Sequence, residues 1–177
     1  MPRSWSAAWA AVERFAHARG AIPATFAWNL AQGAVVPGPS DLLIIPLGIA
    51  DPPRAWYLAI AATAGSVLGG MIAWWLGAAA FETIGRPLLL TIGVSPATLA
   101  RAMSLMQEYG WLFVAGSTLT PISAKVVCIA AGATGMPLGA FAGALALGRS
   151  LRYSLIAILV RETSGPLHRF AQRLHHR

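Results

Sequence analysis

The sequence predicts an all-α integral membrane protein made of two inverted repeats. Each repeat is a proline-broken re-entrant helical hairpin followed by a transmembrane helix, and amphipathic helices lie at the termini. Hydrophobic residues make up 56% of the 177 residues and charged residues only 11%, whereas soluble domains carry about 25% charged residues. Two apolar stretches are long enough to cross a bilayer. Proline interrupts two further apolar segments at matching places in the two halves, which is typical of repeat-built transporters.

The first expected element is an amphipathic helix over residues 4–19, which fills an N-terminal segment, 1–20. Its apolar residues recur at helical spacing: Trp5, Trp9, Val12 and Phe15 or Ala16. Two tryptophans on one face suit a membrane interface. Ordinary packing against the rest of the protein explains the pattern equally well.

The first apolar segment, 21–50, is interrupted by the run Pro37-Gly38-Pro39-Ser40-Asp41. Proline lacks an N–H donor and clashes inside a helix, so the chain should unwind there. Ser40 or Asp41 can then cap a second half-helix. The arms 22–36 and 41–50 are each shorter than the roughly 20 residues that a full span needs. A re-entrant hairpin therefore fits this segment better than a straight helix.

Residues 56–80 carry no charge and are expected to form the first full span. Gly65 and Gly69 give this helix a flat surface for close packing. Residues 82–109 are more polar, and we expect a surface helix there that begins at Ser95-Pro96.

Residues 110–136 repeat the plan of the first segment. An arm over 111–119 meets the break Thr120-Pro121-Ile122-Ser123-Ala124-Lys125, and a second arm over 126–134 follows. The expected hinge residues of the two breaks are Pro37, Gly38, Pro39 and Pro121. Two unrelated kinked helices are the alternative to a repeat.

The second full span is expected over residues 138–160, which closes a membrane domain of residues 21–160. A basic tail, 161–177, follows and is expected to lie on the membrane surface. Arginines flank the spans mainly on the side of the two termini. By the positive-inside rule, both termini then face the cytoplasm, and the protein spans the inner (plasma) membrane more than once.

Four charged residues fall at membrane depth: Asp41, Lys125, Arg149 and Arg152. A charge near the bilayer centre costs about 2.5–3.5 kcal/mol on insertion scales, so such residues face a cavity or pair with one another. The excess of positive charge, with free N–H groups at half-helix starts, suits an anionic group such as a lipid phosphate.

The predicted substrate-binding residues are Lys125, Arg149, Arg152, Asp41, Ser40 and Ser123. In this interpretation the three cations hold the phosphate, and Asp41 is their counter-ion or a proton carrier. The alternative is a buried ion network that only fixes the fold.

Other chemistry finds little support in the sequence. All four histidines lie in the terminal regions, away from any membrane-embedded nucleophile or metal site. Cys128 is the single cysteine, which excludes a disulfide framework. Basic residues flank apolar spans instead of alternating with aromatic residues, so nucleic acid is not the expected partner. We therefore expect neither an enzyme nor a bound metal or cofactor.

Several motifs resemble those of one membrane protein family. They are Val36-Pro37-Gly38-Pro39-Ser40-Asp41, Gly65-Ser66-Val67-Leu68-Gly69-Gly70 with Gly77, Tyr109-Gly110, Pro121, Ala131-Gly132 and Leu147-Gly148-Arg149-Ser150-Leu151-Arg152-Tyr153. Over residues 22–160 the chain resembles the DedA family, also called the SNARE-associated or VTT-domain family, and most of all its YqaA-like branch. The resemblance implies two re-entrant hairpins that face each other across the bilayer. It also implies a role in membrane homeostasis.

The same resemblance implies a lipid-phosphate translocase, a flippase or scramblase for phospholipids or polyprenyl phosphate, in some members with proton coupling. The chain departs from the family pattern Gly-Arg-Phe-x-Pro-x-x-Arg at the second break. Thr118 and Ala124 stand where that pattern has arginines, and Lys125 is the nearest cation. Arg149 and Arg152 are then expected to supply the positive charge.

The expected partners are membrane lipids with anionic phosphate head groups, together with protons. The alternative function is a non-transporting scaffold or accessory protein for envelope integrity. Small-residue faces at Gly65/Gly69 and Gly139/Gly143 suit a homodimer and internal packing equally well.

Overall fold

The computed structural model describes the backbone of residues 3–34, 36, 38–117 and 124–175, and the side chains of 9–34, 36, 38–39, 41–117 and 124–163. Every regular element in these ranges is helical, as predicted. The elements are α1 (Arg3–His17), α2 (Ala21–Ala34), η1 (Ser40–Leu42), α3 (Ile44–Ala50), η2 (Pro52–Arg54), α4 (Ala55–Ala80), η3 (Phe81–Gly85), α5 (Arg86–Thr91), α6 (Pro96–Tyr109), α7 (Trp111–Ser117), α8 (Ala124–Ala133) and α9 (Leu138–His175).

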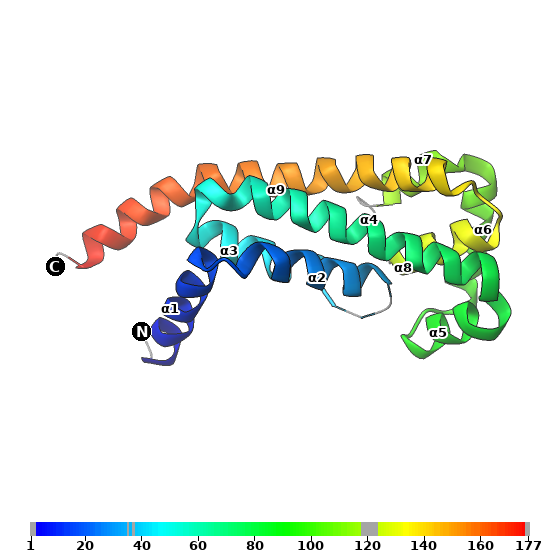
Figure 1. Cartoon of the computed structure of the whole chain (residues 1–177), viewed down its shortest axis with the longest axis horizontal. Coiled ribbons are helices and arrows are strands. Elements are labelled where there is room, and N and C mark those ends of the chain that lie inside the picture. The colour runs from blue at the N-terminus through cyan, green and yellow to red at the C-terminus, as the bar shows by residue number, and fades with distance from the viewer. Residues whose placement is uncertain (1–2, 35, 37, 118–123, 176–177) are drawn as a thin grey trace.

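The molecule is an elongated bundle in which α2, α4 and α9 lie side by side (Figure 1). Helices α4 and α9 run in opposite directions, so both termini lie at one end of the bundle, and α5 to α8 gather at the other end. Two helical stretches, Pro52–Thr91 and Leu138–Thr163, are long and apolar enough to cross a membrane by length and composition. They contain the two spans predicted from the sequence.

The first break lies where the prolines predict it. Helix α2 ends at Ala34 and α3 begins at Ile44. Side chains of α2 bond to carbonyl groups of the break. The Nε1 of Trp28 donates to the Pro39 carbonyl at 3.2 Å, and the Nε2 of Gln32 donates to the Gly38 carbonyl at 3.1 Å. These bonds hold the unwound chain against α2.

Glycines let α4 approach two neighbouring helices closely. A Cβ atom on Gly69 would lie 2.2 Å from the Leu30 carbonyl oxygen of α2, and one on Gly77 would lie 2.0 Å from the Ile129 carbonyl oxygen of α8. Real Cβ atoms do not approach other atoms so closely, so only glycine fits at these crossings. The face at Gly65 and Gly69 is therefore used for packing inside the chain.

The polar stretch 82–109 holds two helices, α5 and α6, in place of one. Ser95 caps α6 as predicted, because its Oγ accepts a hydrogen bond from the Thr98 N–H at 3.1 Å. Leu99 and Met106 of α6 are buried in the core, so this helix covers other helices with one face.

Helices α7 and α8 flank the second break as predicted, and residues 118–123 fall outside the described residues. Ala124 and Lys125, which were expected in the break, instead form the start of α8. Helix α9 continues past residue 160 to His175, so the backbone of the tail extends this helix.

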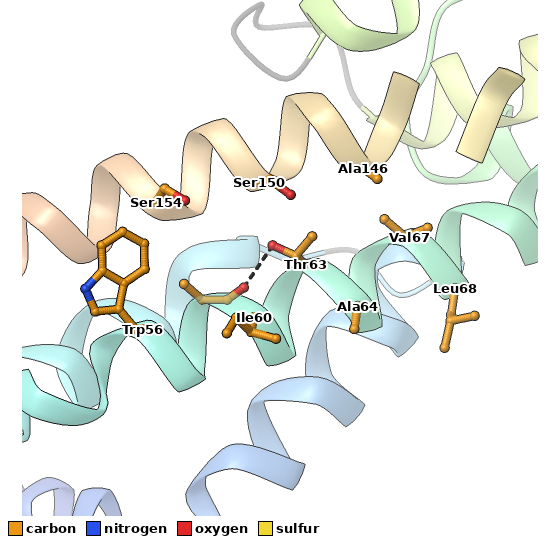
Figure 2. A pocket seen from close by; sticks show the side chains of 10 residues that line it. Trp56, Ile60, Thr63, Ala64, Val67, Leu68, Ala146, Ser150 and Ser154 are labelled. Carbon is orange, nitrogen blue, oxygen red and sulfur yellow. Dashed lines mark hydrogen bonds between the residues drawn. The ribbon is translucent and has the colours of Figure 1, made fainter. Parts of the chain in front are cut away.

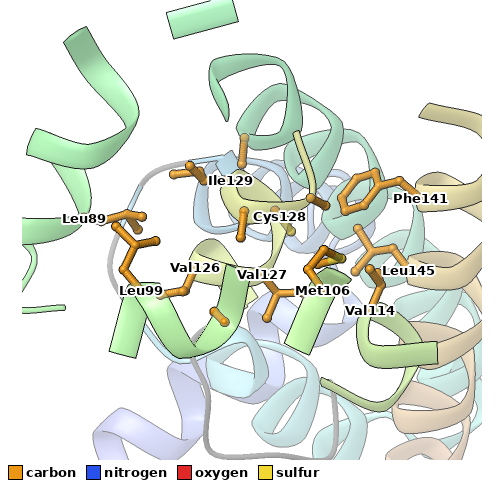
Figure 3. Close-up of a cluster of buried hydrophobic side chains, with 14 of the residues drawn as sticks. Leu89, Leu99, Met106, Val114, Val126, Val127, Cys128, Ile129, Phe141 and Leu145 are labelled. Carbon is orange, nitrogen blue, oxygen red and sulfur yellow. The ribbon is translucent and has the colours of Figure 1, made fainter. Parts of the chain in front are cut away.

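Apolar side chains form two separate clusters. The larger one surrounds α8, and Figure 3 shows its residues Val126 to Ile129 enclosed by side chains of α5, α6, α7 and α9. A helix that is buried on all sides is expected to be apolar all round. The smaller cluster lies at the end of the bundle that carries the termini, and it includes Ala21, Leu47, Leu58 and Tyr153.

Candidate functional site

Polar side chains lie between the two apolar clusters. Gln32 of α2, Ser66 of α4, Lys125 of α8 and Arg149 of α9 are all less than 9% exposed, and we call these four residues the polar layer. At a helical rise of 1.5 Å, Ser66 and Arg149 lie about 16 Å along their helices from Ala55 and Leu138, the first residues. That distance is about half of the ~30 Å hydrocarbon core.

Close helix packing brings together the three helices that carry Gln32, Ser66 and Arg149. A Cβ atom on Gly33, next to Gln32, would lie 3.0 Å from the Ser66 carbonyl oxygen. One turn beyond Ser66, a Cβ atom on Gly70 would lie 2.4 Å from Leu145, which is one turn before Arg149. Residues four apart share a helix face, so Ser66 and Arg149 lie on the facing sides of α4 and α9.

Three buried side-chain atoms in the polar layer lack hydrogen-bond partners among the described residues. They are Gln32 Oε1, Ser66 Oγ and Arg149 Nε. An unsatisfied buried polar group costs about 1–3 kcal/mol, and native proteins contain few of them. A group of such atoms from three helices indicates that this region is built for something other than stability.

The two cations of the polar layer have no acidic partner among the residues that the structure describes. Within the described part of the chain, neither Lys125 nor Arg149 forms an ion pair with a carboxylate. The two positive charges instead repel each other. Lys125 lies in the first turn of α8, where backbone N–H groups without helical partners add to the positive potential. The arrangement favours an anionic ligand.

Asp41 and Arg152 pair at the edge of this region. The Nη2 of Arg152 donates to the Oδ2 of Asp41 at 2.5 Å, and the side chains of Arg152 and Asp41 are 35% and 22% exposed. The contact joins η1 to α9 across 111 residues of sequence. Arg152 is therefore compensated by a carboxylate, in contrast to Arg149.

A buried hydrogen bond that the sequence analysis missed lies next to the polar layer. Tyr153 donates its hydroxyl to Asn29 Oδ1 at 2.8 Å, and both residues are fully buried. The available signal was the spacing of Thr25, Asn29 and Gln32 in an otherwise apolar helix. Residues three and four apart form one polar stripe on a helix, and all three are buried here.

The structure brings some predicted site residues together and leaves others undescribed. Lys125 and Arg149 belong to the polar layer, and Asp41 and Arg152 form the pair beside it. Gly38 and Pro39 bond to α2 through their carbonyl groups. Pro37, Pro121, Ser123 and the side chain of Ser40 lie outside the described residues.

The described part of the chain brings no three histidine, cysteine or carboxylate side chains together in a metal-binding group. Its chemistry is that of cations, amides and hydroxyls.

Comparisons with known proteins agree with the expected family. No solved structure matches the chain. An uncharacterized protein of Haemophilus influenzae is 29% identical over 123 residues, which are 70% of this chain and 63% of that protein. The match thus spans less than two thirds of the relative. The VTT domain matches residues 36–162, which hold both breaks, both long apolar helices and three of the four polar-layer residues. The chain therefore belongs to the VTT domain family.

Proposed function

We propose that the protein moves lipid phosphates between the leaflets of a membrane, as a flippase or scramblase, and binds their head groups at the polar layer. One observation carries this proposal. Two buried cations without acidic partners among the described residues, Lys125 and Arg149, lie beside unpaired polar atoms midway along two helices of membrane-spanning length. Buried ionisable residues at membrane depth typically mark a transport pathway.

In the membrane arrangement that we propose, α4 and α9 are the two full spans. The hairpins α2–α3 and α7–α8 are re-entrant and related as inverted repeats, and both termini face the cytoplasm at the inner membrane. The common location of the termini at one end of the bundle supports this arrangement (Figure 1). Irregular backbone at membrane depth is tolerated where it is buried in protein or lines a cavity. The break meets this condition in part, because side chains of α2 bond to the carbonyl groups of Gly38 and Pro39.

The chemistry of the polar layer fits a phosphate group. The planar guanidinium of Arg149 can bind two phosphate oxygens at once, and the Lys125 ammonium adds a second charge. The Ser66 Oγ, which lacks a partner among the described residues, can donate a further hydrogen bond. Ser40 and Ser123, at the two breaks, are proposed as additional donors.

Asp41 gives the proposed site a link to protons. Its carboxylate now holds Arg152. Protonation of Asp41 would remove the negative charge and let Arg152 turn to the phosphate. Arg152 is therefore the third proposed phosphate ligand. Its transfer from Asp41 to the phosphate, when Asp41 takes up a proton, is the proposed route to proton coupling.

Transport in liposomes tests the proposal. Purified protein is reconstituted, and transbilayer movement of fluorescent phospholipid and polyprenyl-phosphate probes is measured for wild type, Arg149→Gln and Lys125→Gln. A hydrogen bond to a charged group is worth about 1.5–3 kcal/mol, so each substitution should slow movement by roughly ten- to a hundredfold.

Arg101→Gln is the matched control, because Arg101 is an exposed cation on α6, and it should leave the rate unchanged. Lipid movement that is unchanged in folded Arg149→Gln and Lys125→Gln proteins would place the head-group site elsewhere. An absence of movement for wild type would remove the translocase function.

A scaffold function is the second candidate, and the terminal helices favour it. The side chains of Trp9 and Phe15 on α1 are each 40% exposed, and the end of α9 extends beyond the bundle (Figure 1). Deletion of residues 1–19 and 162–177 separates the two functions, because a translocase core keeps its activity and a scaffold loses its partners.

A further inference from the structure

A second feature of the molecule lies on the outer side of α4 and α9. A groove of about 710 Å3 runs between these helices. Figure 2 shows Trp56, Ile60 and Leu68 of α4 along it, and Ala146, Ser150 and Ser154 on the facing side of α9. Among the described residues no charged side chain lines the groove, and its polar side-chain groups are the hydroxyls of Thr63, Ser150 and Ser154 and the indole N–H of Trp56. The hydroxyl of Thr63 already donates to the Ala59 carbonyl of its own helix at 2.8 Å.

We propose that this groove holds an acyl chain of the lipid whose phosphate binds the polar layer, an inference that rests on the proposed function. Both walls belong to the helices of membrane-spanning length, so in a bilayer the groove opens toward hydrocarbon. An uncharged groove in that setting suits a hydrocarbon chain, since lipid tails form no hydrogen bonds and gain from apolar contact.

The length of the groove matches one leaflet. From Trp56 to Leu68 the groove follows α4 for about 18 Å at a rise of 1.5 Å per residue. One leaflet contributes about 15 Å to a hydrocarbon core of ~30 Å. Trp56 lies at the end of the groove nearest the start of α4, where aromatic residues typically mark the membrane interface. A single extended acyl chain therefore fits between that interface and the middle of the bilayer.

The groove ends beside the polar layer. Val67 and Ser150 line the groove, whereas their sequence neighbours Ser66 and Arg149 are buried on the inner side. Several side chains that line the groove near this end are small, among them Ala64 and Ala146. A lipid bound along α4 and α9 can thus keep its chain outside the bundle, directed from mid-height toward Trp56, while its phosphate reaches inward to Arg149. A soluble phosphate would bind only the polar layer and leave the groove empty.

Photocrosslinking tests the groove directly. The full chain in phosphatidylcholine nanodiscs receives phosphatidic acid with a diazirine on its acyl chain, and crosslinked peptides are mapped by mass spectrometry. We expect labelling that unlabelled phosphatidic acid competes away, concentrated in residues 56–68 and 146–154. The double variant Ala64→Phe/Ala146→Phe fills the groove. It should lower this labelling about tenfold, the loss expected when about two methylene groups are displaced from apolar surface.

The control variant is Ala79→Phe/Ala140→Phe, which places the same rings on exposed positions of the same helices and should label like wild type. Circular dichroism and gel filtration establish that both variants are folded. Competable labelling outside the groove, or equal labelling of the filled variant, would overturn the proposal. Disulfide-linked dimers of Ser150→Cys together with an unlabelled groove would also overturn it and assign the groove to a second copy.

The outcomes separate the groove from the translocase function, because labelling needs binding alone. Groove labelling without lipid movement supports the groove and refutes translocation. Lipid movement that depends on Arg149, with labelling elsewhere, supports translocation and refutes the groove.

Discussion

Arg149 and Arg152 are only three residues apart on α9, but their surroundings differ. Arg152 bonds to Asp41 and is partly exposed. Arg149 is 4% exposed, has no hydrogen-bond partner for its Nε among the described residues, and lies near the charge of Lys125. Burial of a charge without a compensating partner is costly, so its replacement by an apolar residue removes a penalty, whereas the loss of one partner from an ion pair destabilises. The two arginines therefore allow a direct comparison.

We expect Arg149→Met to raise the thermal unfolding midpoint of the protein in detergent. The substitution removes a buried charge and an unpaired donor, which should stabilise the fold by about 1–3 kcal/mol. The measurement is a melting curve followed by circular dichroism, read beside the transport rate. A lower midpoint would instead assign Arg149 to a structural ion network.

Arg152→Met should have the opposite effect on stability. It leaves Asp41 without this arginine, and since the pair is partly exposed the expected loss is on the order of 1 kcal/mol. The same melting curve checks it. The double variant with Asp41→Asn should recover most of the loss, and a loss that persists would mean that Arg152 stabilises the fold through contacts other than Asp41.

Tyr153→Phe should destabilise the protein by about 1–3 kcal/mol, because it leaves the fully buried Asn29 Oδ1 without its donor. Denaturant or thermal unfolding measures the change. Tyr57→Phe is the matched control, since the Tyr57 side chain is 61% exposed and should lose little. Equal effects for the two variants would contradict the importance of this hydrogen bond.

At the scale of elements, α8 determines how the second half of the chain packs. Its residues Lys125–Gly132 are all buried, and it crosses α4 at two glycines. A Cβ atom on Gly132 would lie 1.9 Å from the Trp74 carbonyl oxygen, and one on Gly77 would lie 2.0 Å from the Ile129 carbonyl oxygen. Backbone atoms meet at this crossing, so side-chain adjustment cannot make room for a methyl group.

Gly77→Ala should therefore separate α4 from α8 and destabilise the protein by more than about 1 kcal/mol, despite the higher helix propensity of alanine. Gly143→Ala on α9 is the control, because among the described residues no atom beyond the nearby backbone of α9 itself lies within 4 Å of the position that its Cβ atom would take. Unfolding midpoints of the two variants in detergent give the comparison. A tolerated Gly77→Ala would show that the crossing can open at little cost.

The elements were predictable from the sequence to the extent that local chemistry controls them. Proline placed both breaks, because it cannot continue a helix in the apolar segments around Pro39 and Pro121. Ser95 predicted the start of α6, because serine favours the N-cap position of a helix. The burial of Leu99 and Met106 depends on which helices α6 meets. Helix α9 continues to His175 through Gly165 and Pro166, residues that locally favour the end of a helix. Gln32 was missed because the stripe that it forms with Thr25 and Asn29 gains meaning only once the helices that face α2 are known.

At the scale of the whole molecule, the antiparallel α4 and α9 place both termini together (Figure 1). If these helices are the two spans, Ala18 and Thr163 face one side of the membrane and Ala97 faces the other. All three residues are exposed, and the native Cys128 is buried. Cysteine labelling can therefore test the arrangement without removal of the native thiol.

We expect a membrane-impermeant maleimide, added outside intact cells, to label Ala97→Cys and to spare Ala18→Cys and Thr163→Cys. Permeabilised cells should show labelling at all three positions, which establishes that each thiol is reactive. Labelling of Ala18→Cys from outside would reverse the proposed orientation, and labelling of all three from one side would rule out two spans.

The division of the apolar side chains into two clusters has a consequence for the middle of the bundle. Each cluster buries apolar side chains, whereas the polar layer between them contributes polar atoms that have no partner among the described residues. Helices α2, α4 and α9 nevertheless approach closely at this level, as Gly33, Gly69 and Gly70 show. The bundle thus has a hydrophilic seam at mid-height, where side chains can exchange hydrogen-bond partners while the helices around them stay in contact.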